Sequence, residues 1–289
     1  MSHPTIIHHK AALDGQEALP NTLEAVANCL RANAAMIEID ICALATDDYL
    51  VMHDTTLDGE TTGYGEIQAC SVEAARQLKL VHHGTVSSYR PPLLSEVIQL
   101  IASAPGNAVL QLDFKNAYPF VEEEPLHRLS KLIAPLGKRA VVSSVADWQL
   151  RLLHRIAPEI RLGFDPQLYL DWRGKEDEMF PEKLGTYGYW DDYPIAAKRI
   201  WSVTSYLADR CAFLAQQVPG IDMMFIRHDL ITQSLKEGFN WAQALGSRGI
   251  ALAAWTVDLP QSAEAAKQLI AAGVTHITTN TPSKLKVQN

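Results

Sequence analysis

The stretch MIEIDICALATDDYLVMHD, residues 36–54, has the pattern of two strands joined by a tight turn. In an extended strand alternate side chains share a face, so Glu38 and Asp40 point the same way, with α-carbons roughly 6–7 Å apart. Their neighbours are apolar, and two unpaired carboxylates there would repel each other and be costly to desolvate. A bound divalent cation would remove that cost. The alternative is a half-exposed strand whose acids simply face solvent.

The turn at residues 46–49 places a histidine near these acids. Its sequence, Thr-Asp-Asp-Tyr, has turn chemistry because Asp tolerates left-handed backbone and bonds its own main chain, so a hairpin is expected. Counting back from the turn puts His53 opposite Ile41 or Cys42. We therefore expect the His53 imidazole to lie close to the Glu38 and Asp40 carboxylates.

Short apolar runs recur along the chain with helical patterns between them, which is typical of βα units around a parallel sheet. We predict helices at residues 21–33, 95–103, 123–134, 146–156, 232–245 and 260–272, the first capped by Asn21. We predict eight strands, at residues 5–9, 35–42, 108–114, 140–144, 160–164, 222–226, 250–257 and 276–279.

Eight strands with crossover helices predict an α/β fold, a TIM (β/α)8 barrel that forms a single domain over residues 1–289. Chemistry in such barrels takes place at the C-terminal ends of the strands, where His9, Asp40 and Asp113 fall. Residues 165–198 fit no βα unit and are rich in aromatic and charged residues. We interpret this segment as an insertion at the barrel rim that forms a lid or substrate wall.

Composition narrows the function. The chain has 289 residues, 47% of them hydrophobic, and a net charge of −8, which argues against nucleic-acid binding because that needs a basic face. The N-terminus lacks a signal-peptide pattern and no stretch approaches the roughly 18 apolar residues of a membrane span, so we expect a cytoplasmic protein without integral membrane association. The four cysteines contain no CxxC and are expected to be reduced structural thiols. The oligomeric state is not indicated.

One rim of the predicted barrel gathers two histidines, three acids and two lysines: His9, His53, Glu38, Asp40, Asp113, Lys10 and Lys115. Carboxylates hold a hard cation, the cation and lysines neutralise phosphate charge, and histidines transfer protons. The set therefore suits phosphodiester cleavage. Trp255, at the end of another strand, is expected to form the pocket wall rather than barrel core.

The chain resembles the glycerophosphodiester phosphodiesterases, which are barrel enzymes within the phospholipase-C-like phosphodiesterase group. The family's His-Arg-Gly and Pro-Glu-Asn-Thr opening is similar to residues 9–11 and 19–22, and its Glu-x-Asp and His-Asp motifs to residues 38–40 and 53–54. Its Glu-x-Lys strand, Trp-Thr-Val and Thr-Asp-x-Pro signatures resemble residues 113–115, 255–257 and 279–282.

The resemblance implies roles for these residues. One divalent cation, Mg²⁺ or Ca²⁺, would bind Glu38, Asp40 and Asp113. His9 and His53 would form the acid–base pair, and Lys10 and Lys115 would contact the phosphate, with Trp255 at the substrate.

The chain also departs from the family pattern. Lys10 replaces an arginine, whose planar fork grips phosphate bidentately. Pro20 stands where the family has glutamate, and Asp113 is one methylene shorter than the usual glutamate.

We expect a small-molecule partner: a glycerol- or sugar-phosphodiester, hydrolysed to a phosphomonoester and an alcohol. Two alternatives remain at this level. A lyase of the sphingomyelinase D kind shares the barrel and the two histidines but forms a cyclic phosphate, and a non-catalytic phosphodiester-binding barrel would retain the fold without efficient chemistry.

Overall fold

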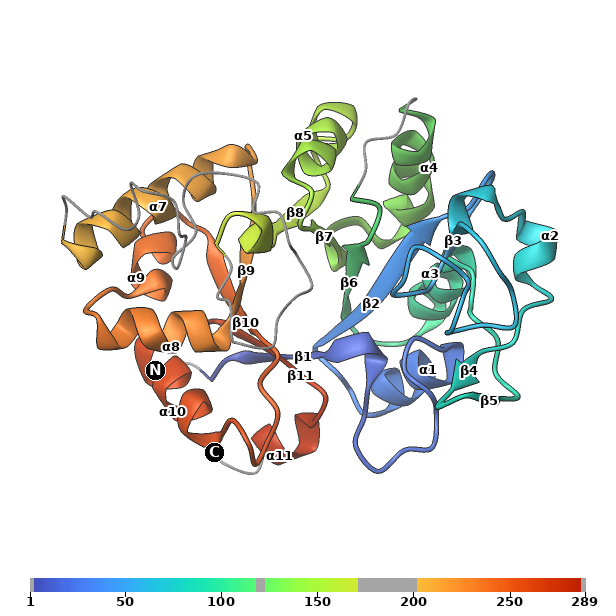
Figure 1. The fold of residues 1–289 in the computed structure, drawn as a ribbon, viewed down its shortest axis with the longest axis horizontal. Coiled ribbons are helices and arrows are strands. Elements are labelled where there is room, and N and C mark those ends of the chain that lie inside the picture. The colour runs from blue at the N-terminus through green and yellow to red at the C-terminus, as the bar shows by residue number, and fades with distance from the viewer. Residues whose placement is uncertain (1–2, 118–122, 171–201, 287–289) are drawn as a thin grey trace.

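The computed structural model describes residues 3–117, 123–170 and 202–286 (Figure 1). Eight parallel strands close into a barrel, because β1 pairs with β11 on one side and with β2 on the other. The predicted α/β barrel is therefore confirmed, with each predicted strand present to within two residues. In barrel order these strands are β1 (Thr5–His8), β2 (Met36–Ala43), β6 (Val109–Phe114), β7 (Ala140–Ser144), β8 (Arg161–Phe164), β9 (Met223–Arg227), β10 (Ala251–Trp255) and β11 (His276–Thr279).

Helices surround the barrel, as Figure 1 shows. Their ends follow local signals: Thr22 caps α1 by accepting a hydrogen bond from the Ala25 N–H, and Gly273 ends α10 with a left-handed φ of 87°. The main helices are α1 (Leu23–Arg31), α3 (Leu94–Ser103), α4 (Glu124–Ile133), α5 (Asp147–Ile156), α7 (Val203–Gln217), α8 (His228–Lys236), α9 (Trp241–Gly246) and α10 (Ala263–Ala272), with a short α11 (Pro282–Lys286) near the end.

Two helix predictions were wrong in detail, and one helix was missed. The single helix predicted at residues 232–245 is two, α8 and α9, because Gly238 takes a positive φ of 87° between them. The helix α7 was not predicted. Thr22 caps α1 in place of Asn21, whose side chain bonds a carboxylate instead.

A small lobe follows β2, on the right of Figure 1. The strand β3 (Tyr49–Leu50) returns antiparallel to β2, which confirms the predicted hairpin. The predicted register was wrong: Cys42 lies opposite Leu50 rather than His53, because the turn spans residues 44–48 instead of 46–49. The chain then forms η2 (Ile67–Ala69), α2 (Val72–Ala75) and the hairpin of β4 (Val81–His82) and β5 (Thr85–Val86). Buried residues of this lobe, such as Leu57, Ile67 and Leu78, form a hydrophobic cluster separate from the main core. The lobe therefore has its own support beside the barrel.

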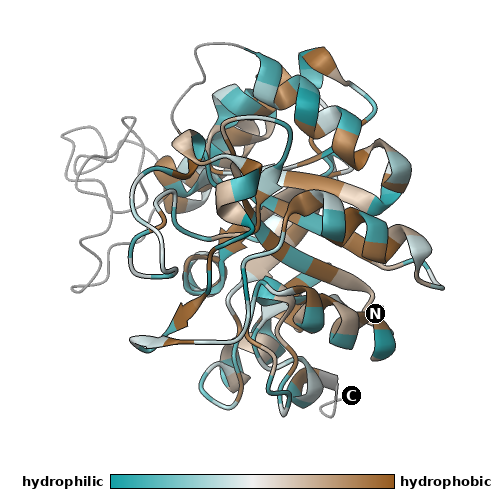
Figure 2. Cartoon of the chain, turned by 90° about the vertical axis from the view of Figure 1, so that its right-hand side faces the viewer, coloured by the Kyte–Doolittle hydropathy of each residue, from teal (hydrophilic) through white to brown (hydrophobic). Residues whose placement is uncertain are grey.

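The main core lies between the strands and the surrounding helices, and Figure 2 shows hydrophobic residues along the strands and hydrophilic ones along the outer helix faces. A second apolar cluster, including Ile7, Met36 and Phe225, fills the barrel interior. Parallel register sets Glu38 opposite Gln111 and Asp40 opposite Asp113. Because side chains in register share a face, acids from β2 and β6 meet above this apolar plug.

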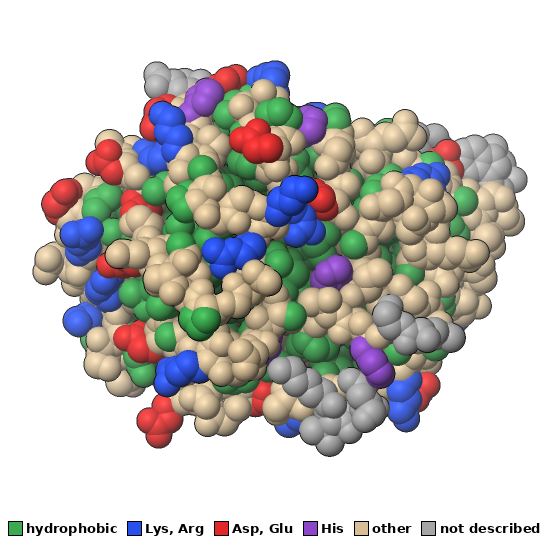
Figure 3. All heavy atoms as spheres, turned by 180° about the vertical axis from the view of Figure 1, so that it is seen from behind, with side chains coloured by type: hydrophobic (Ala, Val, Ile, Leu, Met, Phe, Trp, Pro, Cys, Tyr) green, Lys and Arg blue, Asp and Glu red, His purple; other side chains and the backbone are tan. Residues whose placement is uncertain are grey.

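Other sequence predictions have mixed outcomes. The predicted insertion at 165–198 lies outside the described residues from 171 onward. The four cysteines are buried thiols. On the face drawn in Figure 3 basic and acidic side chains are interspersed. Within the described ranges, no helix is both long enough and apolar enough to cross a bilayer.

Candidate active site

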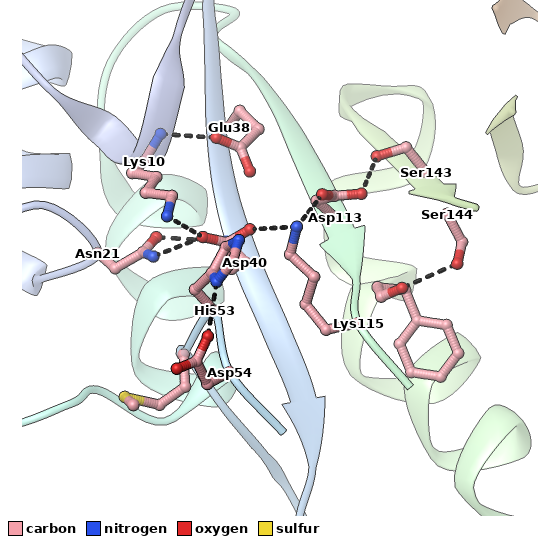
Figure 4. A network of polar contacts seen from close by, with 12 residues as sticks. Lys10, Asn21, Glu38, Asp40, His53, Asp54, Asp113, Lys115, Ser143 and Ser144 are labelled. Atoms are coloured by element: carbon pink, nitrogen blue, oxygen red, sulfur yellow. Dashed lines mark hydrogen bonds and ion pairs between the residues drawn. The ribbon is translucent and has the colours of Figure 1, made fainter. Parts of the chain in front are cut away.

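Three carboxylates form the centre of the site. Glu38 and Asp40 come from β2 and Asp113 from β6, and an oxygen from each lies within 4.8 Å of the others. Glu38 and Asp40 are buried, while Asp113 is partly exposed. Glu38 and Asp40 share a face of β2, as their alternation predicts, and the register of β2 with β6 adds Asp113 to form one cluster, shown in Figure 4.

Two lysines surround this cluster. The Lys115 Nζ lies 2.9 Å from Asp40 Oδ1 and 2.5 Å from Asp113 Oδ2, and the Lys10 Nζ lies 3.6 Å from Asp40 Oδ2. Lys10 also takes a left-handed φ of 52°, and its backbone N–H donates to Glu38 Oε2 at 2.6 Å. Both predicted phosphate-binding lysines therefore lie at the acids, with one ammonium group bridging two carboxylates.

The ionisation of the acids follows from these contacts. Burial, together with the Asp40 and Asp113 charges, raises the pKa of Glu38 well above its usual range. Burial acts in the same direction on Asp40, but the Lys115 and Lys10 ammonium groups outweigh it and lower the pKa of Asp40 to about 2. Glu38 thus lies in an environment with too little positive charge, whereas Asp40 is well compensated.

His9 follows β1 and lies at the same rim. Its Nδ1 is 2.8 Å from the Asn280 Oδ1, beyond the end of β11. Burial lowers the pKa of His9, the hydrogen bond that its Nδ1 donates to Asn280 opposes this, and the Lys10 charge adds to the lowering. His9 is therefore biased towards its neutral form, which can accept a proton.

His53 comes from the chain just after the β2–β3 hairpin. Its Nδ1 lies 2.9 Å from Asp54 Oδ1, and the two side chains are 42% and 50% exposed. His53 lines the same hollow as Glu38 and Asp113, so its imidazole is close to the acids, as Figure 4 shows. A carboxylate next to Nδ1 directs the other ring nitrogen away from Asp54.

Two hollows meet at this rim. One, of about 260 Å³, is lined by His9, Glu38, His53, Asp113 and Trp255. Trp255 therefore lies in the pocket wall, as expected, but its side chain also packs on the apolar cluster of the barrel interior. The second, of about 190 Å³, lies against the small lobe, and both hollows share Lys10 and His53. A molecule that contacts Lys10 and His53 therefore has room on two sides.

Three buried polar atoms in the first hollow have no hydrogen-bond partner among the described residues: Gln111 Oε1, Trp255 Nε1 and Thr278 Oγ1. A buried polar atom without a partner costs free energy, so these atoms are suited to a polar ligand or to water.

Several residues at the site were missed from sequence. Asn21 donates from its amide to Asp40 Oδ2 at 2.8 Å and accepts from the Asp40 N–H at 3.2 Å. Ser143 donates to Asp113 Oδ1 at 3.1 Å. Asn280 contacts the His9 ring, and Asp258 in turn accepts a hydrogen bond from the Asn280 amide. Asn21 and Asn280 lie within the family motifs at residues 19–22 and 279–282, which could have indicated that they are near the site. A side-chain amide in a sequence does not, however, indicate which residue it bonds or whether it donates or accepts.

The donor set fits a hard divalent cation. Mg²⁺ and Ca²⁺ prefer carboxylate oxygens, and the raised pKa of Glu38 shows a buried acid that an added positive charge would stabilise. Another group of close ligand atoms, on His53, Asp54 and Glu60, is more exposed and already uses the His53 Nδ1 for its bond to Asp54. The three carboxylates are therefore the better cation site.

The fold and site define a (β/α)8 barrel protein with carboxylates at the C-terminal rim. A model of the "Glycerophosphoryl diester phosphodiesterase family" matches residues 13–284. The chain therefore belongs to the glycerophosphoryl diester phosphodiesterase family, as the sequence motifs indicate.

Known relatives agree with this membership. A glycerophosphodiester phosphodiesterase from Caldanaerobacter subterraneus is 25% identical over 163 residues, which are 55% of this chain and 65% of that protein, so the alignment spans slightly less than two thirds of the relative. A glycerophosphodiester phosphodiesterase structure from Parabacteroides distasonis has a TM-score of 0.67 at 16% identity, covering 99% of this chain and 96% of its own. An Oleispira antarctica phosphodiesterase, solved with the product sn-glycerol-3-phosphate, has a TM-score of 0.65 at 18% identity, covering 98% and 96%.

Proposed function

We propose that this protein is a phosphoric diester hydrolase that cleaves a glycerophosphodiester to glycerol phosphate and an alcohol, using one divalent cation and two histidines. The observation that carries the proposal is the convergence of His9, His53 and two lysines on the cluster formed by Glu38, Asp40 and Asp113. Family membership and the product bound by the Oleispira antarctica relative support the choice of substrate.

The two hollows suit a phosphodiester. Because Lys10 and His53 line both, a phosphate near them would place one ester group in each hollow. The first hollow offers the unpartnered polar atoms of Gln111, Trp255 and Thr278, which can bond hydroxyl groups such as those of glycerol. The second has more apolar walls, including Leu19 before α1 and Val51 and Leu80 after β2.

Glu38, Asp40 and Asp113 would hold the cation, Mg²⁺ or Ca²⁺, which when bound supplies positive charge that polarises phosphoryl oxygens. Asp113 is a short ligand, and its direction is fixed from two sides, by the hydroxyl of Ser143 and the ammonium of Lys115. Asn21 similarly fixes Asp40 through two hydrogen bonds. These contacts limit the movement of the acids.

The histidines would transfer the protons. One accepts a proton from the attacking water as its oxygen bonds to phosphorus, and the other gives a proton to the alcohol oxygen as its bond to phosphorus breaks. Lys10 and Lys115 lie where they can attract the phosphate charge, with Lys10 acting as a point charge rather than a bidentate fork.

A metal titration tests the proposal. The metal-stripped protein is incubated with an aryl phosphodiester and increasing Mg²⁺ or Ca²⁺, and release of the aryl alcohol is followed by absorbance. We expect release that saturates with metal and is lost on chelation. Binding of glycerol phosphate without any metal-dependent release would contradict the hydrolase and favour a binding protein.

A further inference from the structure

His9 is connected to two neighbouring barrel strands through a chain of side chains. Its Nδ1 lies 2.8 Å from Asn280 Oδ1, and the Asn280 Nδ2 donates to Asp258 Oδ2 at 2.8 Å. His9 follows β1, Asn280 follows β11 and Asp258 follows β10, and these strands are adjacent in the barrel. The ring is thus tied to the ends of the next two strands on one side of its own, β11 and β10.

The direction of the Asn280 amide is fixed by Asp258. An ionised carboxylate only accepts hydrogen bonds, so the Asn280 NH2 group must face it and the amide oxygen must face His9. The Asn280 backbone N–H and the Thr279 hydroxyl also donate to Asp258 Oδ1, at 2.7 and 3.1 Å, and hold that carboxylate in place. If the Asn280 amide flipped, its Oδ1 would face the Asp258 carboxylate oxygen, and the two acceptors would repel each other.

A fixed amide oxygen selects one form of the imidazole. Asn280 Oδ1 can only accept, so the His9 Nδ1 must carry the hydrogen, and the lone pair of the neutral ring then lies on Nε2. His9 lines the first hollow, next to the carboxylate cluster.

We propose that Asn280 and Asp258 are positioning residues for His9, which hold its ring in place and keep it in the Nδ1–H tautomer so that Nε2 is the atom that exchanges a proton. The catalytic part of this inference rests on the proposed function.

The contacts from His9 through Asn280 to Asp258 are not required to connect the segments that follow β10 and β11, because another hydrogen bond does so. The Leu259 N–H donates to the Thr281 hydroxyl at 2.9 Å, which links the segment after β10 to the segment after β11 without touching His9. Thr281→Val therefore serves as a matched control for a purely structural link.

A swap of the two side chains tests the proposal. In D258N the new amide has a donor facing the Asn280 NH2 group, so Asn280 flips and presents that group to His9, which forces the Nε2–H tautomer. In N280D two carboxylates face each other. In the double variant D258N/N280D the new amide donates to the new carboxylate, which again accepts from His9 Nδ1.

We expect each single variant to lower kcat about tenfold or more, with KM changed by less than about threefold. In D258N the wrong tautomer cannot accept the proton, and in N280D the repulsion between the two carboxylates displaces the group that holds the ring. The double variant should recover to within about fivefold of the wild type. T281V should keep kcat within about twofold and lose thermal stability. Single variants with unchanged kcat, a double variant no better than the singles, or a T281V loss equal to that of D258N would each overturn the proposal.

A second measurement does not need turnover. Long-range ¹H–¹⁵N NMR of histidine-labelled protein reports the tautomer of each ring, with His9 identified by the signals that disappear in His9→Gln. We expect the Nδ1–H form for His9 in the wild type and the Nε2–H form in D258N. A wild-type His9 in the Nε2–H form would overturn the inference, whereas absent hydrolysis by a wild type with the expected tautomer would overturn the proposed function alone.

Discussion

His9 and His53 line the same hollow but are held in different ways. His9 is held through a neutral amide, whose direction is set by an acid in the segment after another strand. His53 is held by the carboxylate of the next residue in the chain, and both of these side chains are about half exposed to water. The barrel therefore positions one histidine through long-range contacts, while a loop positions the other through its own sequence.

This difference predicts that turnover needs both histidines equally, but that substitution of the residues that hold His9 lowers kcat more than substitution of the residue that holds His53. A long-range support must have the right donor and acceptor on each side because the barrel fixes its geometry. A neighbouring side chain in solvent can rotate, and water can replace it.

The largest expected effect comes from removing either ring. His9→Ala and His53→Ala should each lower kcat by about 10²–10⁴-fold, the usual contribution of a positioned acid or base. The matched control is His127→Ala, on the exposed face of α4, which should leave kcat unchanged. If either site variant keeps substantial activity with an intact fold, the two-histidine arrangement is wrong.

A metal chelator should lower turnover by removing the cation that both histidines would depend on. Because the cation would supply several kcal/mol of transition-state stabilisation, its removal should lower turnover on the order of 10²-fold or more. Restoring Mg²⁺ or Ca²⁺ should recover the rate in the wild type. In Asp40→Asn recovery should need far more metal, and equal metal dependence in this variant would argue against the assigned ligand.

Replacement of the acid behind His53 should have a smaller effect. In Asp54→Asn the amide can rotate and present its oxygen to His53 Nδ1, so the tautomer is retained. An exposed pair of this kind contributes about 0–1 kcal/mol, which corresponds to at most about a fivefold loss in kcat. Steady-state kinetics of D54N beside D258N gives the comparison directly. A D54N loss as large as that of D258N would remove the distinction between the two supports.

The smallest effect concerns stability in the absence of metal. The folded-state pKa of Glu38 is raised, so folding is favoured when this group is protonated, and that stability is lost as pH rises above the ordinary value of 4.5. Glu38→Gln should therefore melt higher than the wild type at pH 7 in a chelator, by roughly 2–4 °C for each kcal/mol regained. The advantage should vanish near pH 4.

Thermal melts with Ca²⁺ provide the control for this prediction. Added Ca²⁺ should stabilise the wild type but not E38Q, because binding to the folded state raises its apparent stability. A variant that is less stable than the wild type at pH 7 without metal would show that Glu38 is already compensated.

Much of the barrel could be predicted from sequence because its strands are short apolar runs separated by helical patterns. The acids of β2 and β6 were placed at the same rim by strand alternation and by the rule that barrel chemistry lies at strand C-terminal ends. Counting back from a turn predicted the hairpin but gave the wrong register, because the turn lies at residues 44–48 and Cys42 pairs with Leu50 rather than His53. His53 nevertheless lines the same hollow as Glu38 and Asp113.

The supports of the site could not be predicted because they depend on contacts between distant residues. Asn280 is 271 positions from His9, and its role depends on the direction of a flat amide that only Asp258 determines. Asn21 has the composition of a helix cap, but the fold gives that task to Thr22 and turns Asn21 towards Asp40. Side-chain amides carry both donors and acceptors, so their sequence signal is ambiguous.

The most direct measurement of the proposed function is ³¹P NMR of a glycerophosphodiester incubated with the metal-loaded wild type, His9→Ala and His53→Ala. We predict that the wild type converts the diester signal to that of glycerol phosphate, and that neither variant does so at a comparable rate. A stable cyclic phosphate as the final product would contradict hydrolysis and indicate a lyase, and an unchanged diester signal with the metal-loaded wild type would contradict the function altogether.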